Sequence, residues 1–371
     1  MAIKFARRIA DIEISGIRKA FEALSGDYIN LGLGEPDFDT PEHIKAAAVQ
    51  ALKSGFTSYT FNKGMAELRA AVSNKFLRDN NFSVSPEEII VTSGASEALH
   101  IAIHSVVEKG DEVLMPNPCF VSYAALTQLA EGKPIGVPLN EDLTMSIEAL
   151  KELITTKTKA VIINSPANPT GSVESETKLK AVAELACDHH ITIISDEVYE
   201  YHIYDGAKHV SPATFSDEVI TVNAVSKAYA MTGFRLGYLA AREEYVEQML
   251  KIHQYIQACA SSISQKAALA AITGPQECVA EMIREFKRRR DFAVAAFHDL
   301  GMDIPVPRGA FYLFPRVADE AEFVEQLRRR GIIVTPGSAF GTRGKDHVRI
   351  SYATNMANLR RAFELMKDIQ M

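Results

Sequence analysis

The middle of the chain alternates between short apolar runs and segments of helical periodicity, and this alternation restricts the possible folds more than any other feature. The apolar runs are rich in β-branched residues and cover residues 88–92, 112–115, 160–164, 191–195, 219–223 and 236–240. Runs with so little polar alternation are typical of strands buried on both faces, as in parallel sheets covered by helices. The sequence therefore predicts an α/β fold in which helices sandwich a large, mostly parallel sheet.

The pattern changes in the last third of the chain. Long helical patterns from residue 244 to about 262 and from 276 to 300 precede shorter predicted elements, which are strands at 311–314, 332–334 and 348–351 and helices at 320–330 and 356–369. The N-terminal segment, with a predicted helix at 15–24 and strand at 29–32, is expected to pack on this part. At 371 residues two domains are expected. The predicted large domain is 40–275, and the smaller α/β domain is formed by 1–39 and 276–371.

Composition narrows the classes of function. The net charge of −7, with acidic and basic residues interleaved, does not suit a nucleic-acid-binding protein. Apolar stretches are too short for a membrane span, and the first residues lack the apolar core of a signal peptide. The four cysteines form neither a CxxC motif nor a disulfide framework, and the His189–His190 pair has no partner at metal-ligand spacing. We expect a cytoplasmic protein without a metal site.

Lys227 follows the predicted strand 219–223, and Arg235 lies eight positions later beside glycines. Burial disfavours the ammonium form, so a buried lysine is a good amine nucleophile that can form a Schiff base. An arginine grips a phosphate with a fixed fork of donors. The two residues together fit pyridoxal 5′-phosphate (PLP). The alternative, a strand-end lysine that extends to solvent, is about as frequent for such a pair taken alone.

Asp196 and Tyr199 follow the predicted strand 191–195. Ligands of open parallel sheets bind at the carboxyl ends of strands, where a half-buried carboxylate needs a cationic partner. The pyridinium nitrogen of PLP is one such partner. The alternative for Asp196 is an N-cap of a helix that starts at residue 197. Tyr199 could direct its hydroxyl to the cofactor, or be a core tyrosine with a satisfied hydroxyl.

Three further loops and one strand carry candidate residues. Asn168 lies between two prolines in residues 165–171, a rigid loop suited to directed hydrogen bonding. Residues 93–96 are small enough to let backbone N–H groups reach a phosphate at a helix N-terminus, although many turns look alike. Phe120 could stack on a ring or lie in the core. Arg349 sits in the predicted strand 348–351, where it could hold a substrate carboxylate or form a structural salt bridge.

Together these segments resemble one family, the fold-type I PLP-dependent aminotransferases of class I/II, in their aspartate/aromatic branch. The order and spacing match over essentially the whole chain. The matching motifs are Gly-Glu-Pro-Asp-Phe at 34–38, Asn-Pro-Thr-Gly at 168–171, Ser-Asp-Glu-Val-Tyr at 195–199, Ser-Lys at 226–227, Gly-Phe-Arg-Leu-Gly at 233–237, and Arg-Ile-Ser at 349–351.

The resemblance implies a role for each matching residue. PLP would be held covalently by Lys227, at its ring nitrogen by Asp196, at its phenolate oxygen by Asn168 and Tyr199, against its ring by Phe120, and at its phosphate by Ala95, Ser96 and Arg235. Lys227, Asp196 and Tyr199 would act in catalysis. The substrate α-carboxylate would be held by Arg349 and the backbone of Gly34, with Asn168 beside it. Tyr59 resembles the tyrosine that reaches the phosphate of the other subunit, which implies a homodimer with shared active sites.

The chain departs from the family pattern at Ala224, where relatives often have Ser or Gly, so a hydroxyl contact to the phosphate is absent. No residue matches the arginine that binds the distal carboxylate in the classical aspartate enzymes. The resemblance implies a transaminase that moves an amino group from aspartate, an aromatic amino acid or both to a 2-oxo acid such as 2-oxoglutarate. The alternatives are a PLP-dependent β-lyase on the same fold and, less well matched because it would need a preceding DNA-binding domain, a PLP-sensing regulator.

Overall fold

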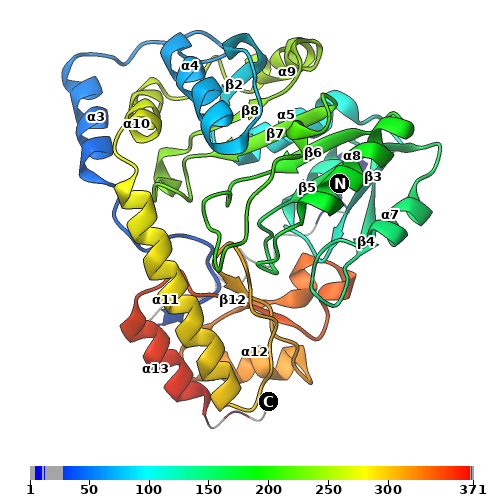
Figure 1. Cartoon of the computed structure of the whole chain (residues 1–371), viewed down its shortest axis with the longest axis vertical. Coiled ribbons are helices and arrows are strands. Elements are labelled where there is room, and N and C mark those ends of the chain that lie inside the picture. Colours follow the sequence, from blue (N-terminus) through cyan, green and yellow to red (C-terminus); the bar gives the residue numbers. More distant parts are fainter. Residues whose placement is uncertain (1–4, 11, 13–27, 368, 370–371) are drawn as a thin grey trace, which may run out of the picture.

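A seven-stranded sheet forms the centre of the computed structural model, which describes residues 5–10, 12, 28–367 and 369 (Figure 1). The strand order is β2-β8-β7-β6-β5-β3-β4. The strands are β2 (Ile89–Thr92), β3 (Glu112–Asn117), β4 (Lys133–Pro138), β5 (Thr158–Asn164), β6 (Thr192–Asp196), β7 (Val219–Ala224) and β8 (Gly237–Ala240). The predicted helix at residues 15–24 lies outside the described residues.

Helices cover both faces of this sheet. On β5, Ile162 packs in a core that includes Leu99 of α5, whereas the next residue, Ile163, packs in a separate core that includes Val182 of α8. Successive side chains of a strand point to opposite faces, so both faces are buried. This explains the unbroken apolar runs and confirms the predicted α/β sandwich.

The described helices around the large sheet are as follows, with α1 near the N-terminus: α1 (Arg7–Ala10), α3 (Glu42–Lys53), α4 (Ala66–Lys75), α5 (Ala95–Val106), α6 (Ser122–Leu129), α7 (Ile147–Leu153), α8 (Glu176–Asp188), α9 (Glu243–Ile256) and α10 (Ser262–Thr273). Single helical turns are η1 (Phe76–Asn80), η2 (Pro86–Glu88), η3 (Pro212–Thr214), η4 (Thr232–Phe234), η5 (Gly337–Phe340) and η6 (Thr342–Gly344).

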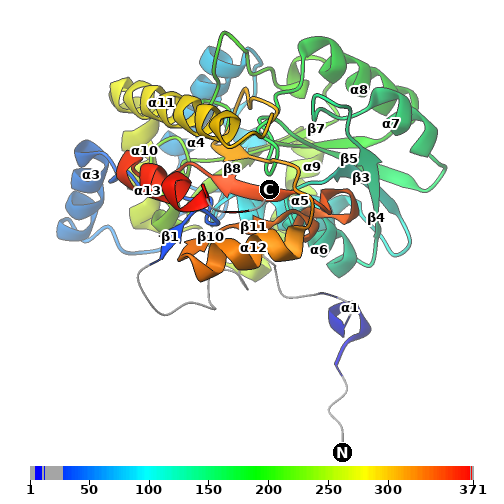
Figure 2. The same ribbon diagram turned by 90° about the horizontal axis from the view of Figure 1, so that it is seen from below.

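Two small sheets form the smaller part of the fold. They pair β1 (Ile29–Asn30) in parallel with β10 (Ile332–Ile333), and they join β11 (Thr335–Pro336), β12 (Val348–Ser351) and β9 (Tyr312–Leu313). Figures 1 and 2 show α12 (Glu320–Arg329) and α13 (Met356–Met366) grouped with these strands, and α11 (Glu277–Asp299) runs from α10 down to α13. The pairing of β1 with β10 joins residues 29–30 to the C-terminal part, whereas the assignment of all of residues 1–39 to the smaller domain stays a prediction. The boundary between residues 275 and 276 stays a prediction.

One local expectation was wrong, and two local features were not indicated by the sequence. Residues 133–138 form β4, which the sequence did not indicate because Pro134, Gly136 and Pro138 interrupt the pattern; an edge strand tolerates them. The helix expected from residue 244 to about 262 ends at Ile256, and the side chain of Ser261 caps a new helix, α10. β8 is antiparallel to both of its neighbours, so the sheet is parallel only from β7 to β4.

Candidate active site

One cavity of about 300 Å³ opens at the edge of the large sheet where β3, β5, β6 and β7 end. It brings together every predicted site residue except Tyr59. The residues come from loops after different strands, as expected for the carboxyl edge of an open sheet. Gly34 and Arg349 reach the same cavity from the smaller part of the fold.

Lys227 lies three residues beyond β7, with its Nζ atom inside the cavity. The amine donates a hydrogen bond to the carbonyl oxygen of Gly34 at 2.6 Å. Burial lowers the pKa of Lys227 to about 8, against the opposing charge of Glu35. A substantial fraction of the amine is therefore neutral near pH 8 and able to attack a carbonyl carbon.

Asp196 is the last residue of β6 and is fully enclosed. Tyr123 of α6 donates a hydrogen bond to its Oδ2 atom at 2.7 Å. Burial raises the pKa of Asp196 to about 6, although the Tyr123 bond opposes that rise. Residues 198–201 form a turn and not a helix, so Asp196 caps no helix there and the N-cap alternative is wrong. The site offers a buried carboxylate suited to a cationic ring nitrogen.

A cradle for an anion lies at the start of α5. The N-cap is Gly94, with φ of 78° and no side-chain cap, so Ala95 and Ser96 present the first turn to the cavity. A Cβ atom on Gly94 would stand 2.7 Å from the guanidinium of Arg235. The helix N-terminus and the arginine therefore meet at one point, and their donors and charge fit a phosphate.

Asn168, Tyr199 and Phe120 line the same cavity. The backbone N–H of Asn168 is fixed by Asn164 Oδ1 at 2.8 Å, and its side-chain oxygen accepts from Arg349 at 2.9 Å. The hydroxyls of Tyr199 and Tyr312 are 2.7 Å apart, so Tyr199 is both satisfied and cavity-facing. Asn168 links the ring-binding and carboxylate-binding sides of the predicted site.

Arg349 is a buried cation on β12, with its guanidinium between the rings of Tyr312 and Phe340. It donates to Asn168 and to the carbonyl of Gly32, and its Nε has no partner among the described residues. No carboxylate within the described part of the chain pairs with it, so the structural salt bridge is not found there. Such a cation is suited to an anionic ligand.

The whole chain matches known proteins. The family model for aminotransferase class I and II covers residues 26–365. The chain belongs to this family. A probable aspartate aminotransferase of Methanocaldococcus jannaschii is 47% identical, with 98% of each chain covered. Aromatic-amino-acid aminotransferase 2 of Thermococcus litoralis is 42% identical over 98% of this chain and 97% of that one. The structure of aspartate aminotransferase from Thermus thermophilus with maleate superposes with a TM-score of 0.94 at 37% identity, over 99% of both chains.

The protein is thus an aminotransferase with PLP as its cofactor, and these relatives support transamination rather than the β-lyase alternative. The residues present fit PLP: Lys227 offers an amine with a lowered pKa, Asp196 a buried carboxylate, and Arg235 with α5 a phosphate cradle. In the described part of the aminotransferase, none of the helices combines the length and apolar character that a bilayer crossing requires.

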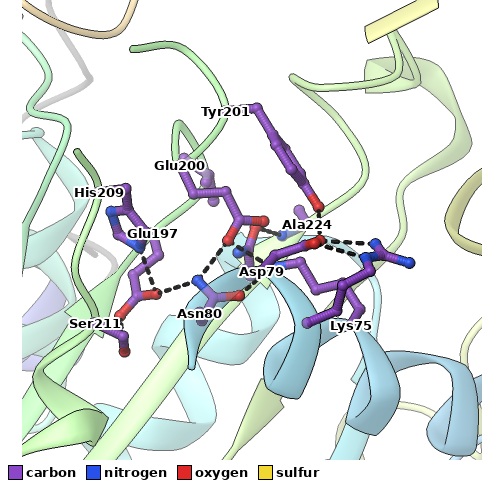
Figure 3. A network of polar contacts seen from close by, with 12 residues as sticks. Lys75, Asp79, Asn80, Glu197, Glu200, Tyr201, His209, Ser211 and Ala224 are labelled. Atoms are coloured by element: carbon purple, nitrogen blue, oxygen red, sulfur yellow. Dashed lines mark hydrogen bonds and ion pairs between the residues drawn. The ribbon is translucent and has the colours of Figure 1, made fainter. Parts of the chain in front are cut away.

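A buried polar network anchors the turn that carries Asp196 and Tyr199 (Figure 3). Glu197 accepts from Ser195, Ser211 and His209, and Glu200 is paired with the ammonium of Lys75 and with Asn80. Glu197, Glu200 and His209 place ligand atoms within 4.8 Å of one another, but Lys75 already supplies the cation. The network holds the backbone of residues 197–200, which lies next to the cavity of the aminotransferase.

Sequence reasoning missed two tyrosines of this aminotransferase. Tyr123 touches Asp196, and Tyr312 contacts Tyr199 while its hydroxyl would stand 2.1 Å from a Cβ atom on Gly34. Tyr123 follows the candidate residue Phe120 by three positions, but no sequence pattern connected it with Asp196. Tyr59 lies outside the cavity of its own chain and is 86% exposed.

Proposed function

We propose that this aminotransferase moves the amino group of aspartate, an aromatic amino acid or both to 2-oxoglutarate. The observation that carries the proposal is that one cavity holds the amine of Lys227 together with the guanidinium of Arg349, which pairs with no carboxylate of the described residues. The relatives named above as aspartate and aromatic aminotransferases support these two substrate classes. Amino-acid screening by the absorbance change of a half-reaction, with each donor tested alone, decides between them.

In this proposal PLP, when bound, supplies an electron sink for the electron pair left as the substrate loses its α-proton. Lys227 Nζ would accept that proton and hold it beside the reacting carbons, so that one residue would serve as general base and then as general acid. Asp196 keeps the ring nitrogen protonated. Arg349, the backbone of Gly34 and Asn168 orient the substrate carboxylate, while Tyr199 and Asn168 donate to the phenolate oxygen and Phe120 covers the ring.

Arg349→Lys is expected to lower kcat/KM for all amino-acid and 2-oxo-acid substrates, mainly through KM. A bidentate guanidinium–carboxylate interaction becomes a single contact, and the expected loss in kcat/KM corresponds to about 2–4 kcal/mol. Steady-state kinetics with several donors measure the loss, and Arg343→Lys, an exposed arginine of η6, serves as the control. An equal loss with a decarboxylated amine would show that Arg349 acts through the fold and not through the carboxylate.

We also propose a homodimer with shared active sites. Tyr59, Phe61, Tyr255 and Ile256 are large side chains that are 48–87% exposed. Tyr59 and Phe61 lie on one loop, and Tyr255 and Ile256 lie at the end of α9. The loop and the end of this helix are in contact, since Asn62 is hydrogen-bonded to Ala258 and to His253. Such a patch is typical of a protein interface, and a second copy would cover it. Tyr59 would then reach the partner's phosphate.

Mixing Tyr59→Phe and Lys227→Ala subunits is expected to restore activity. In a mixed dimer one site receives both defects and the other receives neither. Tyr59→Phe alone should weaken PLP binding by about 1–2 kcal/mol, the contribution of one hydrogen bond to a charged group. After the subunits have dissociated and reassociated, the transamination rate of the mixture must be higher than that of Tyr59→Phe alone at the same subunit concentration. A fully active monomer by light scattering would contradict the shared site.

A cytoplasmic location is part of the same proposal. All four cysteines are free thiols in the structure, which suits a reducing compartment.

A further inference from the structure

A buried carboxylate outside the cavity holds the loop that precedes α5. Glu97, in the first turn of α5, accepts from the backbone N–H of Ser93 at 2.5 Å. It also accepts from His253 Nδ1 at 2.8 Å and from the side-chain amide of Gln257. Ser93 is bound a second time, since its hydroxyl donates to Gln257 at 2.8 Å. Glu97 therefore fixes the backbone immediately before Ala95 and Ser96.

His253 connects Glu97 to a different loop. The ring is fully buried on α9, and its Nε2 atom lies 2.9 Å from the carbonyl oxygen of Asn62. One ring nitrogen thus lies at a carboxylate oxygen of Glu97 and the other at the carbonyl oxygen of Asn62, so the ring bridges the two. His253 thereby supplies a buried hydrogen-bond partner from α9 to Glu97, which is adjacent to Ser96 at the predicted phosphate position.

The loop that presents Tyr59 rests on the same region. Thr60 donates its backbone N–H to Cys259 Sγ at 3.4 Å, and Asn62 donates to the carbonyl of Ala258 at 2.9 Å. These partners follow Gln257 directly in the α9–α10 connection. The loop at 59–62 and the loop at 93–96 are thus both hydrogen-bonded to residues 253–259.

We propose that His253 and Glu97 form a positioning pair that sets two phosphate-binding loops at once. One loop, with Ala95 and Ser96, serves the subunit's own cofactor, and the other, with Tyr59, serves the partner's. The proposal rests on the proposed function, because it uses the phosphate roles of these residues. A defect at His253 should then weaken phosphate binding in both sites of the dimer.

The first test compares two ligands on His253→Gln. PLP should bind roughly tenfold or more weakly, since the ring that links Glu97 to the carbonyl of Asn62 is lost. Pyridoxal, which lacks the phosphate, should bind as it does to the unsubstituted protein. Equilibrium dialysis gives both constants. His100→Gln, on α5 one turn from Glu97, is the matched control and should change neither. Equal weakening of PLP and pyridoxal, or no change in either, overturns the proposal.

Gln257→Ala gives a second variant if His253→Gln does not fold, as judged by circular dichroism and thermal melting. It removes the two hydrogen bonds of Gln257 to Ser93 and Glu97, beside the loop at residues 93–96, and leaves the His253–Glu97 pair in place. It should also weaken PLP binding selectively. A Gln257→Ala protein with unchanged affinity for PLP would contradict the proposed link between the loops.

The second test uses dimers of two differently tagged subunits, in which borohydride fixes PLP to the single remaining Lys227. In the first hybrid, His253→Gln and Lys227→Ala are on different subunits; in the second, both are on one subunit opposite an unsubstituted one. Weaker PLP retention in both hybrids is expected. Weakening only in the first, or in neither, overturns the proposal.

A third hybrid, with Tyr59→Phe and Lys227→Ala on one subunit, tests the shared site separately, because unchanged retention there would show that Tyr59 does not serve the partner.

Discussion

Replacing Lys227 by Ala is expected to abolish transamination and the covalent attachment of PLP. Lys227 is the lysine that the cavity contains, and its lowered pKa of about 8 keeps part of the amine neutral. The buried Lys75 cannot substitute, because Glu200 and Asn80 hold its ammonium. The prediction is checked by activity assay and by peptide mapping after borohydride reduction of the unsubstituted protein.

The mapping should place the pyridoxyl group on Lys227. A pyridoxyl group on any other lysine would contradict the assignment of Lys227 as the lysine that binds PLP covalently, whatever the activity of the Lys227→Ala variant. Lys151→Ala, at an exposed position of α7, is the control and should retain both activity and label. PLP that the phosphate cradle of Lys227→Ala binds without a covalent bond is expected to wash out at high salt, whereas the covalently fixed PLP of the unsubstituted protein should stay.

Asp196→Ala is expected to reduce the rate of the half-reaction by several orders of magnitude while leaving PLP covalently attached. Without the carboxylate the ring nitrogen loses its proton, and a neutral ring accepts electrons poorly. Stopped-flow absorbance measures the rate, and borohydride labelling of Lys227 measures the attachment. Asp188→Ala, at the exposed end of α8, is the control. Turnover close to that of the unsubstituted protein would show that Asp196 does not serve the ring nitrogen.

Much of the fold could be predicted because burial on both faces leaves a plain record in the sequence. Ile162 and Ile163 face opposite cores, so the run that contains them had to be apolar throughout. β4 left no such record, since an edge strand pairs on one side only and tolerates Pro134 and Pro138. The reversed direction of β8 was also invisible, because strand direction depends on pairing and not on local pattern.

The candidate site was predictable where a side chain is chemically unusual for its position. Lys227 and Arg349 are cations in apolar surroundings, and Asp196 is a carboxylate at a strand end. Tyr123 and Tyr312 are not unusual in this sense, since tyrosines are common in cores and their partners, Asp196 and Tyr199, lie 73 and 113 residues away. Contacts between residues so far apart in the sequence depend on the topology of the sheet, which cannot be derived from a single sequence.

The antiparallel course of β8 has a consequence for how the chain can be divided. Because β7 and β8 are neighbours that run in opposite directions, the segment between them leaves the sheet and returns at the same edge. This returning segment carries both Lys227 and Arg235, which stay in one fragment when the chain is cut in any loop outside it. A chain split near the exposed residues 205–206 would keep these two proposed cofactor ligands in its C-terminal piece, while Asp196 and the proposed phosphate cradle at α5 would stay in the other. Cofactor binding could then report directly on the reassembly of the two halves.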